Sequence, residues 1–195
     1  MPFPGINAFK EQLLDGGARP SLFTMEVTWP VSIPVGTAAA LKLPWHCRIA
    51  EIPGKTQNPI IFKYAGREVK FAGQTVFDNL RLTIINDEAY TVRRALDTWM
   101  EYINTRETNI ALTQASPTAA GYAGTGVVKQ WGKDGTVKQI YTFVDMFPQR
   151  VDPIPLDWGQ DAQIEDYSVE FAYQYWTPGN LSSAIGSIAG AAING

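Results

Sequence analysis

The stretch from residue 77 to residue 102 restricts the possible folds more than any other part of this chain. Between residues 80 and 84, apolar side chains alternate with polar ones, which is the pattern of a β-strand with one buried face. A helical pattern follows almost at once. The chain therefore places a half-buried strand directly before a helix, and the sheet that contains the strand is expected to carry the helix.

The helix is predicted over about residues 87–104. Asn86 or Asp87 can accept hydrogen bonds from the free amides at its start, and the charges of Asp87 and Glu88 suit the positive end of the helix dipole. One apolar stripe runs along the helix at spacings of three and four residues. We expect this stripe to pack on the protein's own sheet, and the alternative is a face for a partner helix. The stripe consists of Ala89, Val92, Leu96, Trp99 and Ile103.

Most of the remaining chain predicts β-structure. A short helix is predicted over residues 6–16, a loop over residues 108–126, and a break in regular structure at Pro30, Pro34 and Gly36. One hairpin is expected to turn at Ala65-Gly66 and another at residues 133–135. The other predicted strands span residues 21–29, 43–51, 60–64, 67–71, 126–132, 136–147 and 167–175.

These elements predict a mainly β fold with one long flanking helix. One helix covers only part of so many strands, so the remaining strand edges must close on each other or be covered by another chain. A barrel or a sandwich satisfies this requirement. The 195 residues are expected to form one domain over residues 1–176, with an N-terminal arm at 1–17 and a Gly/Ala/Ser-rich extension at 177–195.

The residues offer little for catalysis. His46 and Cys47 are neighbours on a predicted strand and point to opposite faces, so they make a poor nucleophile–base pair. Glycines at 121, 124 and 126 lack the lysine and serine of a phosphate loop. The acidic cluster of residues 152–166 lacks the pattern of a calcium-binding loop, and a solvated loop or a subunit contact is the simpler reading. The cluster consists of Asp152, Asp157, Asp161, Glu165 and Asp166. We therefore expect no catalytic, cofactor or metal site.

The net charge of −3 and the isoelectric point of about 5.2 argue against a protein that grips nucleic acid through its phosphates. Residues 181–193, the longest apolar-looking run, are too few to cross a bilayer, and we expect neither a secretory signal nor a membrane anchor.

Several short segments, in their order along the chain, resemble the tail tube protein of contractile-tailed bacteriophages. The resemblance extends over about residues 18–176 and also relates the chain to the inner tubes of bacteriocins and type VI secretion systems. The matching segments are Ala18–Phe23, His46–Gly54, Phe77-Asp78, Asn86–Ala89 with Trp99, and Tyr173–Trp176.

This resemblance implies a barrel-like subunit of two packed antiparallel sheets. It also implies hexameric rings that stack into a hollow tube, through which viral DNA passes without specific binding. The implied partners are further copies of the chain, a tail sheath protein, a baseplate and a tail terminator. The implied location is the virion tail, assembled in the host cytoplasm. A neutral or acidic wall would suit a conduit through which DNA slides without sticking.

The family uses a protruding hairpin for stacking, so residues 55–73 are the candidate for contacts between rings. The alternative is an ordinary surface hairpin. The candidate residues are Ile60, Phe62, Tyr64, Gly66, Arg67, Val69 and Phe71.

Two other functions stay open. The first alternative to a phage tube is the inner tube of a bacteriocin or type VI-like injection system. Less favoured is a small enzyme or ligand-binding barrel that uses the acidic cluster.

Overall fold

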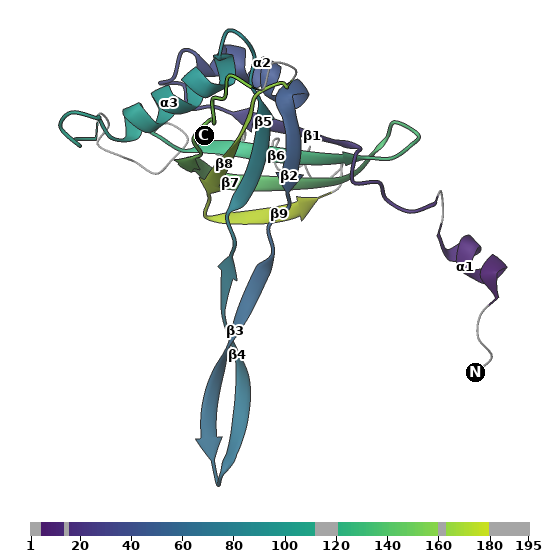
Figure 1. Cartoon of the computed structure of the whole chain (residues 1–195). Coiled ribbons are helices and arrows are strands. Elements are labelled where there is room, and N and C mark those ends of the chain that lie inside the picture. The colour runs from purple at the N-terminus through teal and green to yellow at the C-terminus, as the bar shows by residue number, and fades with distance from the viewer. Residues whose placement is uncertain (1–4, 14–15, 112–120, 160–162, 180–195) are drawn as a thin grey trace, which may run out of the picture.

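The computed structural model describes residues 5–13, 16–111, 121–159 and 163–179 of the chain. A broad sheet carries helices at one end and a long hairpin at the other (Figure 1). The elements are α1 (Ile6–Gln12), β1 (Phe23–Thr28), α2 (Gly36–His46), β2 (Cys47–Glu51), β3 (Lys55–Tyr64), β4 (Arg67–Phe77), β5 (Leu80–Ile85), α3 (Thr91–Ile103), β6 (Gly124–Trp131), β7 (Val137–Val151), β8 (Asp166–Ala172) and β9 (Tyr175–Gly179).

Seven strands form one antiparallel sheet in the order β1-β6-β7-β8-β5-β2, with β9 also paired to β7. Strand β7 joins the two halves, because its first part pairs with β6 and β9 and its last part pairs with β8. The change of partner occurs around Asp145, whose φ of 52° bends the strand. Strands β1 and β2 approach each other, but no hydrogen-bonded ladder joins them in the part of the chain that the structure describes.

The predicted class, mainly β with antiparallel pairing and a flanking helix, is confirmed. The two expected sheets are the two halves of this continuous sheet, and the described strands do not close into a barrel. The hairpin β3–β4 forms a separate two-stranded sheet.

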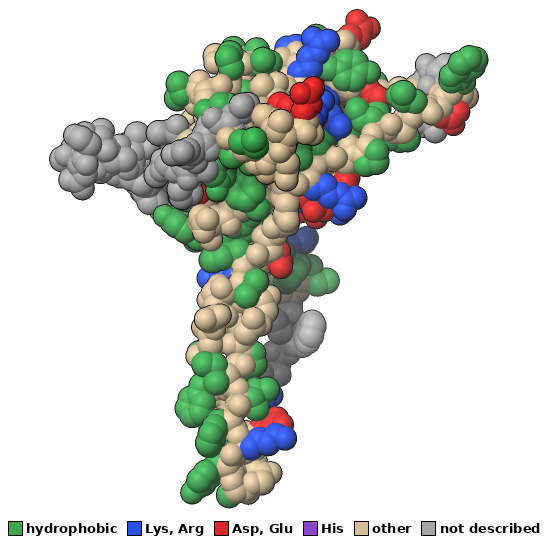
Figure 2. Space-filling view, turned by 90° about the vertical axis from the view of Figure 1, so that its left-hand side faces the viewer, with side chains coloured by type: hydrophobic (Ala, Val, Ile, Leu, Met, Phe, Trp, Pro, Cys, Tyr) green, Lys and Arg blue, Asp and Glu red, His purple; other side chains and the backbone are tan. Residues whose placement is uncertain are grey.

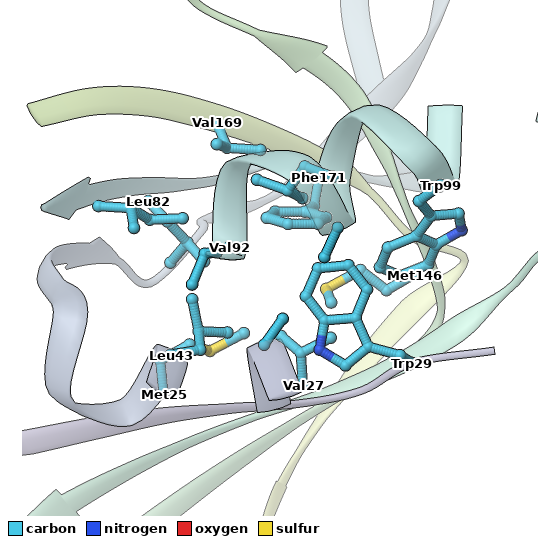
Figure 3. Packing of buried hydrophobic residues seen from close by; sticks show 14 of the residues in the cluster. Met25, Val27, Trp29, Leu43, Leu82, Val92, Trp99, Met146, Val169 and Phe171 are labelled. Carbon is cyan, nitrogen blue, oxygen red and sulfur yellow. The ribbon is translucent and has the colours of Figure 1, made fainter. Parts of the chain in front are cut away.

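The core lies between the sheet and the two helices α2 and α3 (Figure 3). Strand β5 alternates as predicted: Leu80, Leu82 and Ile84 are fully buried, and they lie beside the alternate buried residues of β8. Trp99 of α3 packs against Trp29, with ring centroids 4.9 Å apart. This apolar burial is the main favourable contribution to folding.

Helix α2 corrects two predictions. The break expected around Gly36 is the start of a helix, and the strand expected over residues 43–51 begins only at Cys47. An alanine-rich run follows Gly36, and alanine has the highest helix propensity. Ala39 and Leu43 lie one turn apart on the buried face, and Gly36 leaves room for Trp29, since a Cβ there would be 2.6 Å from the Trp29 Cβ.

Helix α3 begins at Thr91, four residues later than predicted, because residues 87–90 form a turn in which the Tyr90 amide donates to the Asp87 carbonyl. Asp87 still meets a free amide: its carboxylate accepts a hydrogen bond from the Thr91 N–H at 2.8 Å. Desolvation opposes ionisation, but hydrogen bonds from Lys42 and Thr91 outweigh it and hold the pKa of Asp87 below its usual value.

Only part of the apolar stripe predicted for the helix lies on the buried face of α3. Ala89 lies in the turn before α3 and is exposed, so its assignment to the packing face is wrong. The structure buries Val92, Leu96 and Trp99, and it packs Ile103 against the rim of the core.

Other boundaries also differ from the prediction, and β3, β4 and β7 extend beyond their predicted ends. Helix α1 ends at Gln12, and the last predicted strand is divided at residues 173–174 into β8 and β9. The described part of the predicted loop 108–126 ends in a strand, because β6 starts at Gly124. Strand β9 crosses the boundary expected after residue 176, while residues 180–195 lie outside the described part. None of the helices within the described ranges has the length and hydropathy of a membrane span.

Gly124 permits the closest contact in the core. A Cβ at this position would lie 2.5 Å from the Thr28 carbonyl oxygen and 2.9 Å from the Trp99 ring. We expect Gly124→Ala to lower the free energy of unfolding by about 1–3 kcal/mol, because the Thr28 backbone and the Trp99 ring must move away from the added methyl group. Urea denaturation measures the loss. Gly5→Ala is the matched control, since a Cβ at Gly5 meets nothing within 4 Å; equal stability of both variants and the parent protein would contradict this account.

Candidate assembly surfaces

The hairpin β3–β4 extends away from the sheet (Figure 1). Its strands pair with each other, and every residue of β3 is exposed. In β4 only Gly73 and Phe77 are partly covered. A long exposed strand pair with large apolar side chains is a surface that another chain can cover.

The two faces of this hairpin differ in character. Cross-strand partners share a face, so one face carries apolar side chains and Arg67, whereas the other face carries most of the charges. Figure 2 shows hydrophobic side chains along one side of the hairpin and charged side chains on the opposite side near the tip. The pairs on the apolar face are Ile60–Phe71, Phe62–Val69 and Tyr64–Arg67, and those on the charged face are Ile61–Lys70 and Lys63–Glu68.

All the hairpin residues singled out from the sequence therefore belong to one face or to the tip. At the tip, Ala65 and Gly66 have φ values of 48° and 78°, which define a two-residue turn of type I′. Glycine adopts this conformation without steric cost, whereas the Cβ of Ala65 makes the positive φ energetically unfavourable.

Aromatic side chains fix the root of the hairpin to the sheet. Phe77 contacts Tyr173 and Trp176 at ring-centroid distances of 6.3 and 6.5 Å, and the Tyr173 hydroxyl donates to the Asp78 carbonyl. Desolvation, together with the nearby Asp78 charge, raises the pKa of Tyr173 to about 12. The phenol therefore stays a neutral donor at neutral pH.

Other surfaces suited to assembly lie outside the hairpin. Strands β1 and β2 each pair on one side only within the described ranges. Helix α1 projects from the body and exposes Ile6 and Phe9 (Figure 1). A third surface carries the strongly exposed side chains of Leu156, Trp158 and Ile164; the prediction of a solvated loop or subunit contact at residues 152–166 did not single out these three residues. Its sequence signal is large apolar residues placed among Pro and Asp in the segment Pro155-Leu156-Asp157-Trp158.

The acidic residues near this third surface do not converge. Asp152 forms ion pairs with Arg150 and Arg81 at 2.7 and 3.6 Å, and Asp166 pairs with Arg48. No group of three or more His, Cys, Asp or Glu side chains that could hold a metal ion occurs within the described ranges. Asp161 lies outside them.

The contacts of His46 and Cys47 are those of structural residues and not of a catalytic pair. The His46 Nδ1 lies 2.8 Å from the Lys42 carbonyl oxygen at the end of α2. Burial raises the pKa of the Cys47 thiol to about 12, which leaves it unreactive at neutral pH. Gly124 and Gly126 belong to β6, where they make room for Trp99 and Met146 instead of forming a phosphate loop.

Comparison with known proteins identifies the family. The phage tail tube protein family matches residues 18–178, which is most of the chain. The chain belongs to this family. The tail tube protein gp19 of Enterobacteria phage T4 is 26% identical over 164 residues, covering 82% of this chain and 90% of the phage protein. The tail tube protein of Serratia phage KSP90 is 24% identical over 171 residues, covering 86% and 93%.

Solved structures show the same fold. A chain of the anti-feeding prophage baseplate matches with a TM-score of 0.59 and 17% identity, covering 85% of this tail tube protein and 97% of that chain. A chain of an extracellular contractile injection system, the PVC sheath–tube complex, matches with a TM-score of 0.57 and 12% identity, covering 88% and 97%.

This tail tube protein is thus a structural tail tube subunit and a component of the virion tail. The tail tube family to which it belongs is not enzymatic.

Proposed function

We propose that this tail tube protein assembles as hexameric rings that stack into a hollow tube, and that viral DNA passes through this tube during infection. The observation that carries the proposal is the amphipathic hairpin, which stands clear of the sheet and exposes a continuous apolar face. An isolated subunit would leave this face in water, whereas a stack of subunits would bury it.

The ring itself requires a second pair of surfaces, because neighbours in a ring meet through two different patches. Strands β1 and β2 support this step, since each is paired on one side only in the described part. Backbone hydrogen bonds from neighbouring subunits would complete these edges and remove the risk of uncontrolled strand addition. The anti-feeding prophage baseplate, which shares the fold, is described as 6-fold symmetrised and supports the ring number.

The charge of the chain suits a DNA conduit. A formal net charge of −3 disfavours tight contact between the subunit and the phosphate backbone. DNA would then slide through the tube without specific binding.

The proposed partners are further copies of the chain, a tail sheath protein, a baseplate and a tail terminator. The fold occurs in a sheath–tube complex and in a sheath/tube terminator of the PVC injection system, which supports these partners. Assembly would take place in the host cytoplasm, and we propose no membrane anchor.

The alternative is the inner tube of an injection system, which carries no viral genome. The anti-feeding prophage and PVC structures favour this candidate through the fold, whereas the tail tube proteins of phages T4 and KSP90 favour a phage through the sequence. Electron microscopy of particles from producing cells distinguishes the two, since a phage tail carries a DNA-filled head and an injection system does not.

The proposal predicts that the purified subunit forms rings and tubes, and that their amount increases with protein concentration. Negative-stain microscopy and analytical ultracentrifugation measure the two products. A protein that stays monomeric at millimolar concentration would overturn the proposal.

A further inference from the structure

The hairpin needs a complementary surface on the next ring, and the fold restricts where this surface lies. In a polar stack, each subunit presents its hairpin at one end and must receive a hairpin at the other. The receiving residues therefore belong to the end of the subunit opposite the hairpin.

Strand pairing identifies this opposite end. Strand β5 starts at Leu80, next to the hairpin root, and ends at Ile85. Ile85 pairs with Asp166, the first residue of β8, so the segment that leads into β8 lies at the end of the sheet far from the hairpin. Hydrogen bonds from Asn86 and Tyr90 to Glu165 hold the end of this segment against the turn before α3.

The far end carries an apolar surface of its own. Trp158 is fully exposed, and Leu156 and Ile164 are nearly so. Leu156 and Ile164 line one surface hollow together with Asp157 and Glu165, and Trp158 follows Asp157 directly in the chain. We call Leu156, Trp158 and Ile164 the far-end surface. Neighbouring apolar side chains left in water mark a site that another molecule can cover, and tryptophan is enriched among the residues that contribute most to binding at interfaces.

The charges at the two ends are complementary. Residues 59–72 of the hairpin contain Lys63, Arg67 and Lys70 against the single acid Glu68, and Arg67 lies on the apolar face beside the tip. The far-end surface contains Asp157 between its two largest apolar residues. The Asp157 carboxylate accepts a hydrogen bond from the Gly159 N–H. It forms no ion pair within the part of the chain that the structure describes.

We propose that the far-end surface of one subunit receives the apolar face of the hairpin from a subunit in the adjacent ring, with Arg67 directed towards Asp157. This inference rests on the proposed function, since it presupposes stacked rings. It adds the partner surface: the occupant is a second copy of the chain, and the contact is aromatic and aliphatic with a positive tip against an acidic rim.

Two variants with opposite defects test this assignment. Trp158→Ser retains the hairpin but damages the receiving surface. The second variant retains the receiving surface but lacks the hairpin, because an Asn-Gly turn replaces residues 58–74 between the paired residues Gln57 and Thr75. Trp158 is fully exposed, so its substitution leaves the fold unchanged, and ring formation by each variant verifies this.

Each variant alone is expected to form single rings, and the protein concentration that Trp158→Ser needs for stacking should rise by more than about tenfold. An equimolar mixture of rings that were formed separately from each variant should give pairs of rings and nothing longer, because the only productive contact joins the intact hairpins of one ring to the intact receiving surfaces of the other. Trp45→Ser is the matched control. Trp45 is 86% exposed near the end of α2, and the following residue pair Cys47–Ile84 places it at the same end of the sheet. This variant should still form tubes, because Trp45 lies outside the far-end surface.

Normal tubes from Trp158→Ser, or loss of stacking from Trp45→Ser alone, would overturn the assignment while leaving the tube function intact. Absence of rings and tubes from the unmodified protein would instead overturn the proposed function itself. Electron microscopy and sedimentation velocity distinguish single rings, paired rings and tubes.

Discussion

Replacement of residues 58–74 by an Asn-Gly turn is expected to leave a folded, ring-forming subunit that no longer stacks. The residues removed contribute no buried side chain, and the aromatic contacts of Phe77 at the hairpin root remain. Stacking should be lost because the variant lacks the exposed apolar face that another copy would cover. Denaturant unfolding should show a free energy close to that of the parent protein, and electron microscopy should show rings without tubes.

Point variants make this test independent of the deletion. Phe62 and Ile61 are adjacent, 60% and 53% exposed, and on opposite faces of the hairpin. Phe62→Ser should prevent tube growth, whereas Ile61→Ser should have little effect. Equal effects of the two variants would show that hydrophobicity of the hairpin as a whole, and not its apolar face, drives the contact.

Trp99→Ala is expected to have the largest effect on stability, lowering the free energy of unfolding by about 3–5 kcal/mol. Trp99 is fully buried, packs between Trp29 and Phe171, and donates its indole N–H to the Tyr122 carbonyl at 2.6 Å. Its removal leaves a cavity beside the narrow space at Gly124 and an unpaired carbonyl. This loss is a large part of the 5–15 kcal/mol that is typical of a domain.

Trp45→Ala is the matched control for this measurement. It removes the same side chain from a position that is 86% exposed, so the urea midpoint should change little. A Trp99→Ala variant as stable as Trp45→Ala would show that the stability of the core does not depend on the contacts of Trp99.

The sequence predicted the elements whose pattern is local. Strand β5 was evident because alternation needs only neighbours two residues apart. Asp87 was identified as a capping residue, yet the start of α3 was placed too early. The reason is that the turn at residues 87–90 also has helix-compatible residues, and only the left-handed φ of Tyr90 separates it from the helix.

Helix α2 shows how tertiary context overrides a local signal. Pro30, Pro34 and Gly36 predict broken structure, but Gly36 is needed because Trp29 lies against its backbone. The division of the last strand into β8 and β9 has a similar cause. Residues 173–174 lie opposite the bend of β7, where the Gln174 amide donates to the Val144 carbonyl, and this bend is not visible in the sequence of either strand.

By itself, the sequence determined that this chain is a mainly β protein with a hairpin that turns at Ala65-Gly66 and one strongly amphipathic helix, because each of these depends on residue types at short spacing. Only the tertiary structure decided that the hairpin stands clear of the sheet, that β7 joins two half-sheets, and that Trp158 lies at the end of the subunit opposite the hairpin. These depend on which distant strands pair, and that pairing is set by the packing of the whole core around Trp99 and its neighbours.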